Sequence, residues 1–167
     1  DRVLASQDPE ASALITEVFA QRSMTVIGNS RAAAAVNTGE GVQVTLADGR
    51  VLEGSHCLMA VGSVPNTSDV GLVEAGVELN DAGYIVVDKV SRTTARGVYA
   101  AGDCTGVFPL ASVAATQGRI AMAHALGDAV SPIDLRQVAS NVFTAPEIAS
   151  VGASEAELVE RGIFYQV

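Results

Sequence analysis

Short, mostly apolar runs that are each followed directly by a glycine recur along the chain. Residues 24–27, 57–61 and 98–101 form such runs, and all three are too short to be buried helices. We therefore expect buried strands there, with a further strand at residues 84–87 after the turn residues 81–83. Strands that alternate with helices predict the α/β fold class.

Three helices are predicted, at positions 8–22, 109–127 and 154–162, from the capping residues at their ends. The first opens with an aspartate N-cap, a proline and an acidic residue, and the third opens with a capping box of Ser154 and Glu157. In the second, Pro109 suits the first turn and Gly127 the C-terminal stop. The first helix is expected to bury one face, made of Leu14, Ile15, Val18 and Phe19.

Between residues 31 and 52 the pattern changes to that of antiparallel strands. Residues 42–46 alternate between apolar and polar and are closed by Asp48 and Gly49, which predicts a hairpin. Residues 32–35 are alanines and therefore strong helix formers, so a helix is the competing interpretation there. The valine, asparagine, threonine and glycine that follow favour a strand leading into a turn.

Residues 94–106 hold the most specific pattern of the chain. Gly102 lets a ligand or another backbone come close at the end of the predicted strand, and Asp103 places a carboxylate where open α/β sheets bind ligands. The free N–H groups of Leu110, Ala111 and Ser112, at the start of the next helix, suit an anion or an electron-rich ring. The alternative is a buried strand with an N-capping aspartate and no ligand.

This stretch resembles the second FAD-binding motif of the flavoprotein disulfide reductase family, which includes dihydrolipoamide dehydrogenases. The resemblance implies that Gly102 and Asp103 bind FAD, with the aspartate hydrogen-bonded to the ribityl chain. It also implies that Leu110 and Ala111 face the N1 and C2 carbonyl side of the flavin. NAD(P)H is the implied co-substrate.

Two further stretches resemble the same family, in the family's order. Residues 57–67 resemble the return from the NAD(P)-binding domain to the FAD domain, for which a hinge role is expected, and residues 141–152 resemble the start of the dimerisation domain. The implied organisation is the C-terminal half of an NAD(P)-binding domain at residues 1–62, the second FAD-domain segment at 63–134, and the start of an α+β dimerisation domain at 135–167. A homodimer is implied with it.

The sequence lacks three features of the family: its redox-active cysteine pair, both of its Gly-x-Gly-x-x-Gly motifs and its His-x4-Glu motif. The chain also opens on Asp1 rather than Met, so we expect a middle slice of a larger enzyme, inactive alone, in which no catalytic residue can be named.

Dihydrolipoamide dehydrogenases usually carry Leu-Ala-His where this chain has Leu110, Ala111 and Ser112. The sequence is more similar to a quinone-reducing subgroup known from actinobacteria, so hydride transfer from NAD(P)H through flavin to a quinone ranks first. A dihydrolipoamide dehydrogenase-type disulfide oxidoreductase ranks second, and a non-catalytic binding fragment is the alternative of another class.

Charge narrows the range of partners. Nineteen acidic and ten basic residues give a net charge of −9, which disfavours nucleic acid. Neither a membrane span nor a signal peptide is indicated, so a soluble, cytoplasmic protein is expected. Cys57 and Cys104 have neither redox-pair nor zinc spacing, and both are expected to be reduced and buried, while His56 and His124 do not look like metal ligands.

Overall fold

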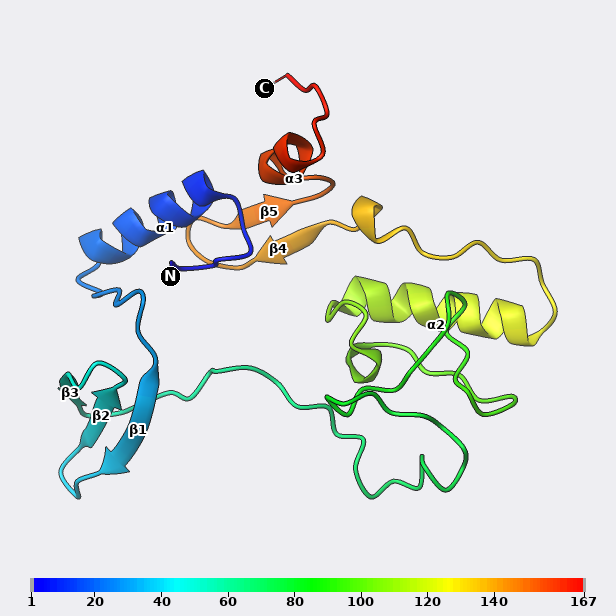
Figure 1. The fold of residues 1–167 in the computed structure, drawn as a ribbon, viewed down its shortest axis with the longest axis horizontal. Coiled ribbons are helices and arrows are strands. Elements are labelled where there is room, and N and C mark those ends of the chain that lie inside the picture. Colours follow the sequence, from blue (N-terminus) through cyan, green and yellow to red (C-terminus); the bar gives the residue numbers. More distant parts are fainter. Residues whose placement is uncertain (1, 167) are drawn as a thin grey trace. The chain divides into compact units, whose positions relative to one another are not determined.

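The computed structural model describes residues 2–166, which contain three α-helices, five strands and two 3-10 helices (Figure 1). The chain forms two compact units. Unit 1 comprises Asp1–Val61, Asn141–Ile148 and Ala153–Val167, and unit 2 comprises Gly62–Ser140 and Ala149–Gly152.

Helix α1 (Pro9–Gln21) in unit 1 begins and ends close to the predicted positions. The Asp8 carboxylate accepts a hydrogen bond of 2.8 Å from the Glu10 N–H, and proline occupies the first turn, where a missing N–H is not needed. The predicted apolar face is only partly buried, because Ile15 is 1% exposed whereas Leu14 is 55% exposed.

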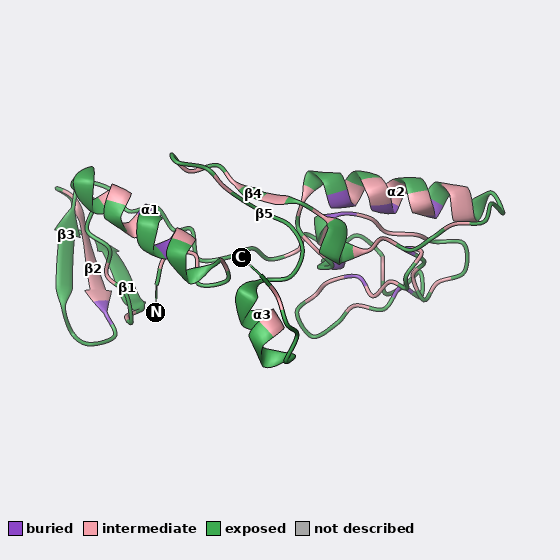
Figure 2. Ribbon diagram, turned by 90° about the horizontal axis from the view of Figure 1, so that it is seen from above, coloured by how far each residue is buried: buried purple, intermediate pink, exposed green. Residues whose placement is uncertain are grey.

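The hairpin predicted between residues 31 and 52 is confirmed as a three-stranded antiparallel sheet. Strands β1 (Ala32–Asn37), β2 (Val42–Leu46) and β3 (Val51–Gly54) pair in the order β1-β2-β3. The alanines of β1 are therefore in a strand, and the competing helix is excluded. As the central strand, β2 is less exposed than its neighbours and ends on the buried Leu46 (Figure 2).

The predicted strands at residues 24–27 and 57–61 are not present. Both segments lack strand structure and are mostly exposed, with Leu58 89% exposed. A strand requires a hydrogen-bonded neighbour, and no segment among residues 2–166 pairs with either run. The expectation that Cys57 is buried is wrong, because the residue lies in one of these exposed segments.

Helix α2 (Ala111–Ala125) is the main element of unit 2, and its buried face is visible in Figure 2. Gly127 ends it as predicted, with φ 90° and an N–H that donates to the His124 carbonyl oxygen. The strands predicted at 84–87 and 98–101 are extended segments that each make one isolated antiparallel bridge, Leu79 with Ile85 and Arg92 with Tyr99. Turns interrupt both ladders before a second pair can form.

The last elements are a pair of short strands, a 3-10 helix and the predicted third helix. Strands β4 (Ser140–Val142) and β5 (Ile148–Ser150) pair around a turn that contains Pro146. Helix α3 (Glu155–Glu160) begins with the capping box of Ser154 and Glu157, and a 3-10 helix, η2, covers Leu135–Gln137.

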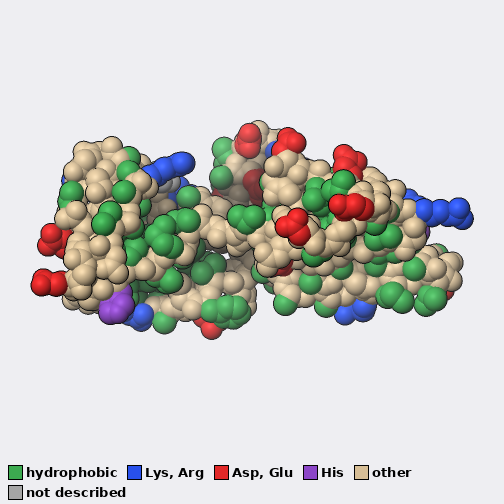
Figure 3. Space-filling view, turned by 90° about the horizontal axis from the view of Figure 1, so that it is seen from below, with side chains coloured by type: hydrophobic (Ala, Val, Ile, Leu, Met, Phe, Trp, Pro, Cys, Tyr) green, Lys and Arg blue, Asp and Glu red, His purple; other side chains and the backbone are tan. Residues whose placement is uncertain are grey.

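Apolar side chains are spread over the surface drawn in Figure 3. Among the most exposed are Val61, Val64 and Phe164, at 84%, 86% and 96%. Surface of this kind is usually covered by other protein. None of the helices within residues 2–166 has the length and apolar character needed to cross a bilayer.

Candidate functional site

Asp103 lies in a tight turn, the 3-10 helix η1 (Asp103–Thr105), directly after the extended segment that ends at Ala101. Gly102, before the turn, has φ 89°, and Gly106, after it, has φ 65°. The Asp103 side chain is exposed, and among residues 2–166 no group donates a hydrogen bond to its carboxylate. Both oxygens are therefore available to a ligand.

The turn forms one wall of a pocket of about 510 Å³. Its lining residues all belong to unit 2 and come from three segments: Ser63, Val64, Pro65 and Asn66; Tyr84; and Asp103, Cys104, Gly106 and Pro109. The sequence predicts a hinge role for residues 57–67, and four of these residues, 63–66, also line the pocket beside Asp103.

Tyr84 fixes the shape of the pocket next to the turn. A Cβ atom at Gly106 would lie 2.8 Å from Tyr84 Cγ, which is closer than real Cβ contacts, so the tyrosine ring occupies the space that a side chain there would need. The next residue, Ile85, donates its N–H to the Cys104 carbonyl oxygen at 2.9 Å. The segment that carries Tyr84 is thus attached to the Asp103 turn.

Helix α2 begins two residues later than its proline suggests. Leu110 is the N-cap and is extended (φ −133°, ψ 138°), so Pro109 precedes the helix and its predicted place in the first turn is wrong. The Leu110 N–H is also occupied, because it donates to the Phe108 carbonyl oxygen at 2.8 Å. The first-turn N–H groups of Ala111 and Ser112 have no acceptor within an α-helix and remain the candidates for a ligand.

Gln117 connects helix α2 to the Asp103 turn, and sequence reasoning missed it. Its side chain is 3% exposed, and its Oε1 accepts a hydrogen bond of 2.8 Å from the Gly102 N–H. Its Nε2 donates to Thr105 Oγ1 at 3.4 Å. The available signal was a polar residue at helical spacing between two apolar ones, Val113 and Ala121, which are both buried.

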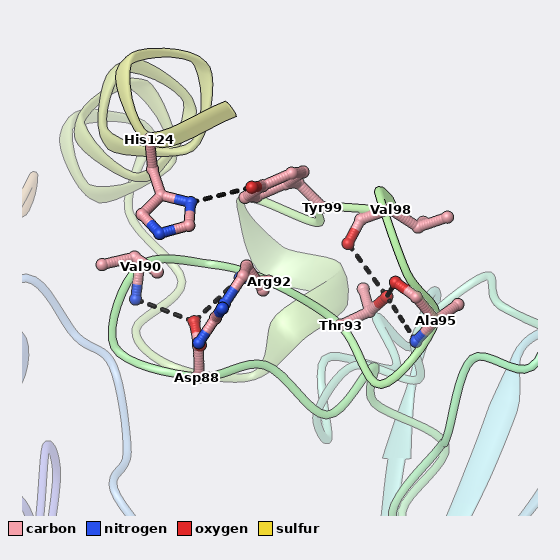
Figure 4. Close-up of polar contacts among 8 residues, drawn as sticks. All are labelled: Asp88, Val90, Arg92, Thr93, Ala95, Val98, Tyr99 and His124. Carbon is pink, nitrogen blue, oxygen red and sulfur yellow. Dashed lines mark hydrogen bonds and ion pairs between the residues drawn. The ribbon is translucent and has the colours of Figure 1, made fainter. Parts of the chain in front are cut away.

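A second aspartate turn lies earlier in unit 2 (Figure 4). Asp88 Oδ1 accepts from the N–H groups of Val90 and Arg92 at 2.9 and 3.0 Å, and Oδ2 accepts from Arg92 Nε at 2.7 Å. Burial acts to raise the pKa of Asp88, but the backbone and guanidinium of Arg92 and the Val90 N–H outweigh it and lower the pKa below its ordinary value. This carboxylate is fully used by its own turn.

Tyr99, which bridges to Arg92, also reaches helix α2 (Figure 4). Its hydroxyl and His124 Nδ1 are hydrogen-bonded at 2.8 Å. The segment that leads to Asp103 is therefore hydrogen-bonded to α2 at two positions, Tyr99 and Gly102. Both cysteines are free thiols, Cys104 being half-buried, and no cluster of three metal-ligating side chains occurs within residues 2–166.

Comparison with known proteins identifies the family. The family model described as pyridine nucleotide-disulphide oxidoreductase matches residues 1–118. The chain belongs to the pyridine nucleotide-disulphide oxidoreductase family. This confirms the resemblance seen in the sequence, and the matched residues include Gly102 and Asp103.

The relatives in this family carry several activities. The chain is 58% identical over 156 residues to an NAD(P)H dehydrogenase (quinone) of Mycobacterium tuberculosis, covering 93% of this chain and 32% of that protein. It is 36% identical to a mercuric reductase of Streptomyces lividans and 32% identical to a dihydrolipoyl dehydrogenase of Staphylococcus aureus, covering 99% and 96% of this chain and 35% of each relative.

Solved structures agree with this assignment. The crystal structure of LpdA from Mycobacterium tuberculosis matches with a TM-score of 0.87 and 56% identity, covering 92% of this chain and 34% of that one. The flavoprotein disulfide reductase RclA from Escherichia coli matches with a TM-score of 0.85 and 28% identity, covering 94% of this chain and 36% of that one. The chain thus spans about a third of the length of the relatives it matches.

Proposed function

We propose that this chain is part of an FAD-dependent oxidoreductase that passes hydride from NAD(P)H through the flavin to a quinone. The observation that carries the proposal is the Asp103 carboxylate, which has no hydrogen bond within the described chain and lines a pocket just before the start of α2. The 58% identity to a protein named NAD(P)H dehydrogenase (quinone) supports the choice of acceptor.

The groups around Asp103 fit a flavin. The carboxylate can accept a hydrogen bond from a hydroxyl of the ribityl chain, and Gly102 brings the backbone close without a side chain in the way. The N–H of Ala111, with Leu110 beside it, would face the N1 and C2 carbonyl edge of the ring. A helix N-terminus stabilises negative charge there by about 0.3–1 kcal/mol, and by more where the site is partly buried.

When bound, FAD would take up a hydride from the nicotinamide and return two electrons to the acceptor. The net reaction converts NAD(P)H, a proton and a quinone to NAD(P)⁺ and a hydroquinone. The part of this chain is to bind and orient. Asp103 would fix the ribityl chain, and the first turn of α2 would favour the reduced, more negative form of the ring.

The wider assignments follow the order of the family motifs. We propose that residues 1–62 belong to an NAD(P)-binding domain, residues 63–134 to the FAD-binding domain and residues 135–167 to the start of a dimerisation domain. The exposed apolar residues Phe143, Val159 and Phe164 in the last segment support a homodimer. A cytoplasmic location is proposed with this reading.

The test is anaerobic reduction of the intact purified protein. We expect a yellow protein whose flavin absorbance is bleached by NADH or NADPH and recovers when a benzoquinone is added. Recovery with lipoamide instead would replace the quinone by a disulfide. A protein that is colourless and takes up no added FAD would contradict the proposal and leave a non-catalytic binding role.

A further inference from the structure

We propose that Gln117 is a positioning residue for flavin binding, because it holds the Asp103 turn on the helix whose first turn faces the ring. This inference rests on the proposed function. It assigns a role to a side chain of α2 that does not line this pocket and is hydrogen-bonded to Gly102, the residue before the pocket-lining Asp103.

The geometry is a closed set of hydrogen bonds around Gly102. Gln117 Oε1 accepts from the Gly102 N–H, and Gln117 Nε2 donates to Thr105 Oγ1. Thr105 Oγ1 in turn donates to the Gly102 carbonyl oxygen at 2.7 Å. Both peptide groups of Gly102 are thereby fixed, and Gln117 and Thr105 are buried, at 3% and 7% exposed.

The turn needs such a support because it starts at a glycine. Gly102 has φ 89° and ψ −161°, a region open to glycine and to almost no other residue. A glycine can leave this conformation as easily as it adopts it, and a rotation at Gly102 moves the next residue, Asp103. The amide of Gln117 removes that freedom, since any other conformation would leave the buried Gly102 N–H without an acceptor.

The amide also sets the distance between the two parts of the site. Gln117 and Ala111 lie on one continuous helix, six residues or roughly 9 Å apart along its axis. Fixing Gly102 to Gln117 therefore fixes the carboxylate of Asp103 relative to the N–H groups at the start of α2. A ligand that uses both, as we propose for FAD, needs this distance to be held.

The test is a double-mutant cycle on the FAD dissociation constant of the intact apoprotein. Gln117→Met keeps the length and helix propensity of the side chain and removes both hydrogen bonds. We expect Asp103→Ala to weaken FAD binding by about 10- to 100-fold, because a hydrogen bond to a charged group is lost. Gln117→Met alone should weaken it by about 10- to 30-fold, and the double variant should be no more than about 2-fold weaker than Asp103→Ala alone.

Additive effects would overturn the proposal, because Gln117 would then act on stability and not through Asp103. Unchanged binding in Asp103→Ala would instead contradict the proposed site, so the two failures are distinct. Thr116→Ala, at the neighbouring half-buried position whose hydroxyl is bonded only within α2, is the matched control and should show neither a loss nor a coupling.

Two further variants add to the test, and the second, Thr105→Val, keeps it decisive if Gln117→Met does not fold. Gln117→Glu retains the acceptor for the Gly102 N–H and should restore most of the affinity lost in the methionine variant. Thr105→Val removes the hydroxyl that completes the set of hydrogen bonds and should reproduce the coupling to Asp103. A glutamate variant as weak as the methionine variant, or a valine variant without coupling, would count against the proposal.

Discussion

Unit 2 contains two aspartate turns that have similar backbones but use their carboxylates differently. Asp88 and Asp103 each follow an extended apolar segment, and each turn contains a residue in the left-handed region, Ser91 at φ 67° and Gly106 at φ 65°. The Asp88 carboxylate accepts three hydrogen bonds from its own turn, whereas the Asp103 carboxylate accepts none from residues 2–166.

The difference separates an aspartate whose carboxylate is used by its own turn from one whose carboxylate is available, as we propose, to the flavin. The Asp88 carboxylate replaces the backbone acceptors that its turn lacks and would lose these bonds if it turned to a ligand. The Asp103 turn is stabilised by Gln117 and Thr105 instead, which leaves its carboxylate free at the pocket. A side chain can serve a ligand when other groups have taken over the stabilisation of its turn.

The largest effect on stability is expected for Gly106→Ala. The new Cβ would lie 2.8 Å from Tyr84 Cγ. The alanine would also have to adopt the positive φ of Gly106, 65°, which is unfavourable for a residue with a Cβ. We expect the free energy of unfolding to fall by about 2–4 kcal/mol, from overpacking plus backbone strain. Urea unfolding of the intact apoprotein measures it.

Ser91→Ala is the control for that prediction. Ser91 lies in the Asp88 turn at φ 67°, close to the φ of Gly106, and it already carries a Cβ, so the substitution adds neither backbone strain nor a new contact. It should cost less than about 1 kcal/mol. A Gly106→Ala variant as mild as Ser91→Ala would show that Tyr84 does not pack on the Asp103 turn.

An intermediate effect is expected for Asp88→Ala. The substitution removes the acceptor of two backbone N–H groups and of the Arg92 side chain, as the loss of a helix N-cap does. Because the Asp88 and Arg92 side chains are partly exposed, we expect the free energy of unfolding to fall by only about 1 kcal/mol. Hydrogen exchange of the Val90 and Arg92 amides should become faster. FAD affinity should stay within about 2-fold of the wild type, and a loss like that of Asp103→Ala would remove the distinction between the turns.

The smallest effect concerns pH. The pKa of Asp88 is lowered in the folded protein, so its contribution is present above the unfolded pKa and is lost as pH falls through the lower, folded pKa. The wild type should therefore lose slightly more unfolding free energy than Asp88→Asn on acidification below about pH 4, by less than about 1 kcal/mol because the pair is partly exposed. Urea unfolding at pH 7 and pH 3 compares the two, and equal losses would exclude the contribution.

Local signals carried most of what the sequence predicted correctly. The N-caps at Asp8 and Ser154 and the turn at Asp48 and Gly49 act within a few residues, and each element begins or turns where they predict. The helix of residues 109–127 was offset at its start because Leu110, after the proline, is extended.

The errors concern interactions between distant residues. A strand depends on the neighbour that pairs with it, so the apolar composition of residues 24–27 and 57–61 could not decide their structure. The role of Gln117 depends on a hydrogen bond to Gly102, fifteen positions earlier, and only its place on an apolar helix face pointed to it. The family resemblance predicts a role for Asp103, but not the hydrogen bonds of Gln117 and Thr105 that hold its turn.

The most direct test of the distinction between the two turns is a paired titration of intact apoprotein with FAD. We predict that Asp103→Ala weakens binding by about 10- to 100-fold while Asp88→Ala leaves it within about 2-fold of the wild type. Equal affinities for Asp103→Ala and the wild type would contradict the assignment of Asp103 to the flavin.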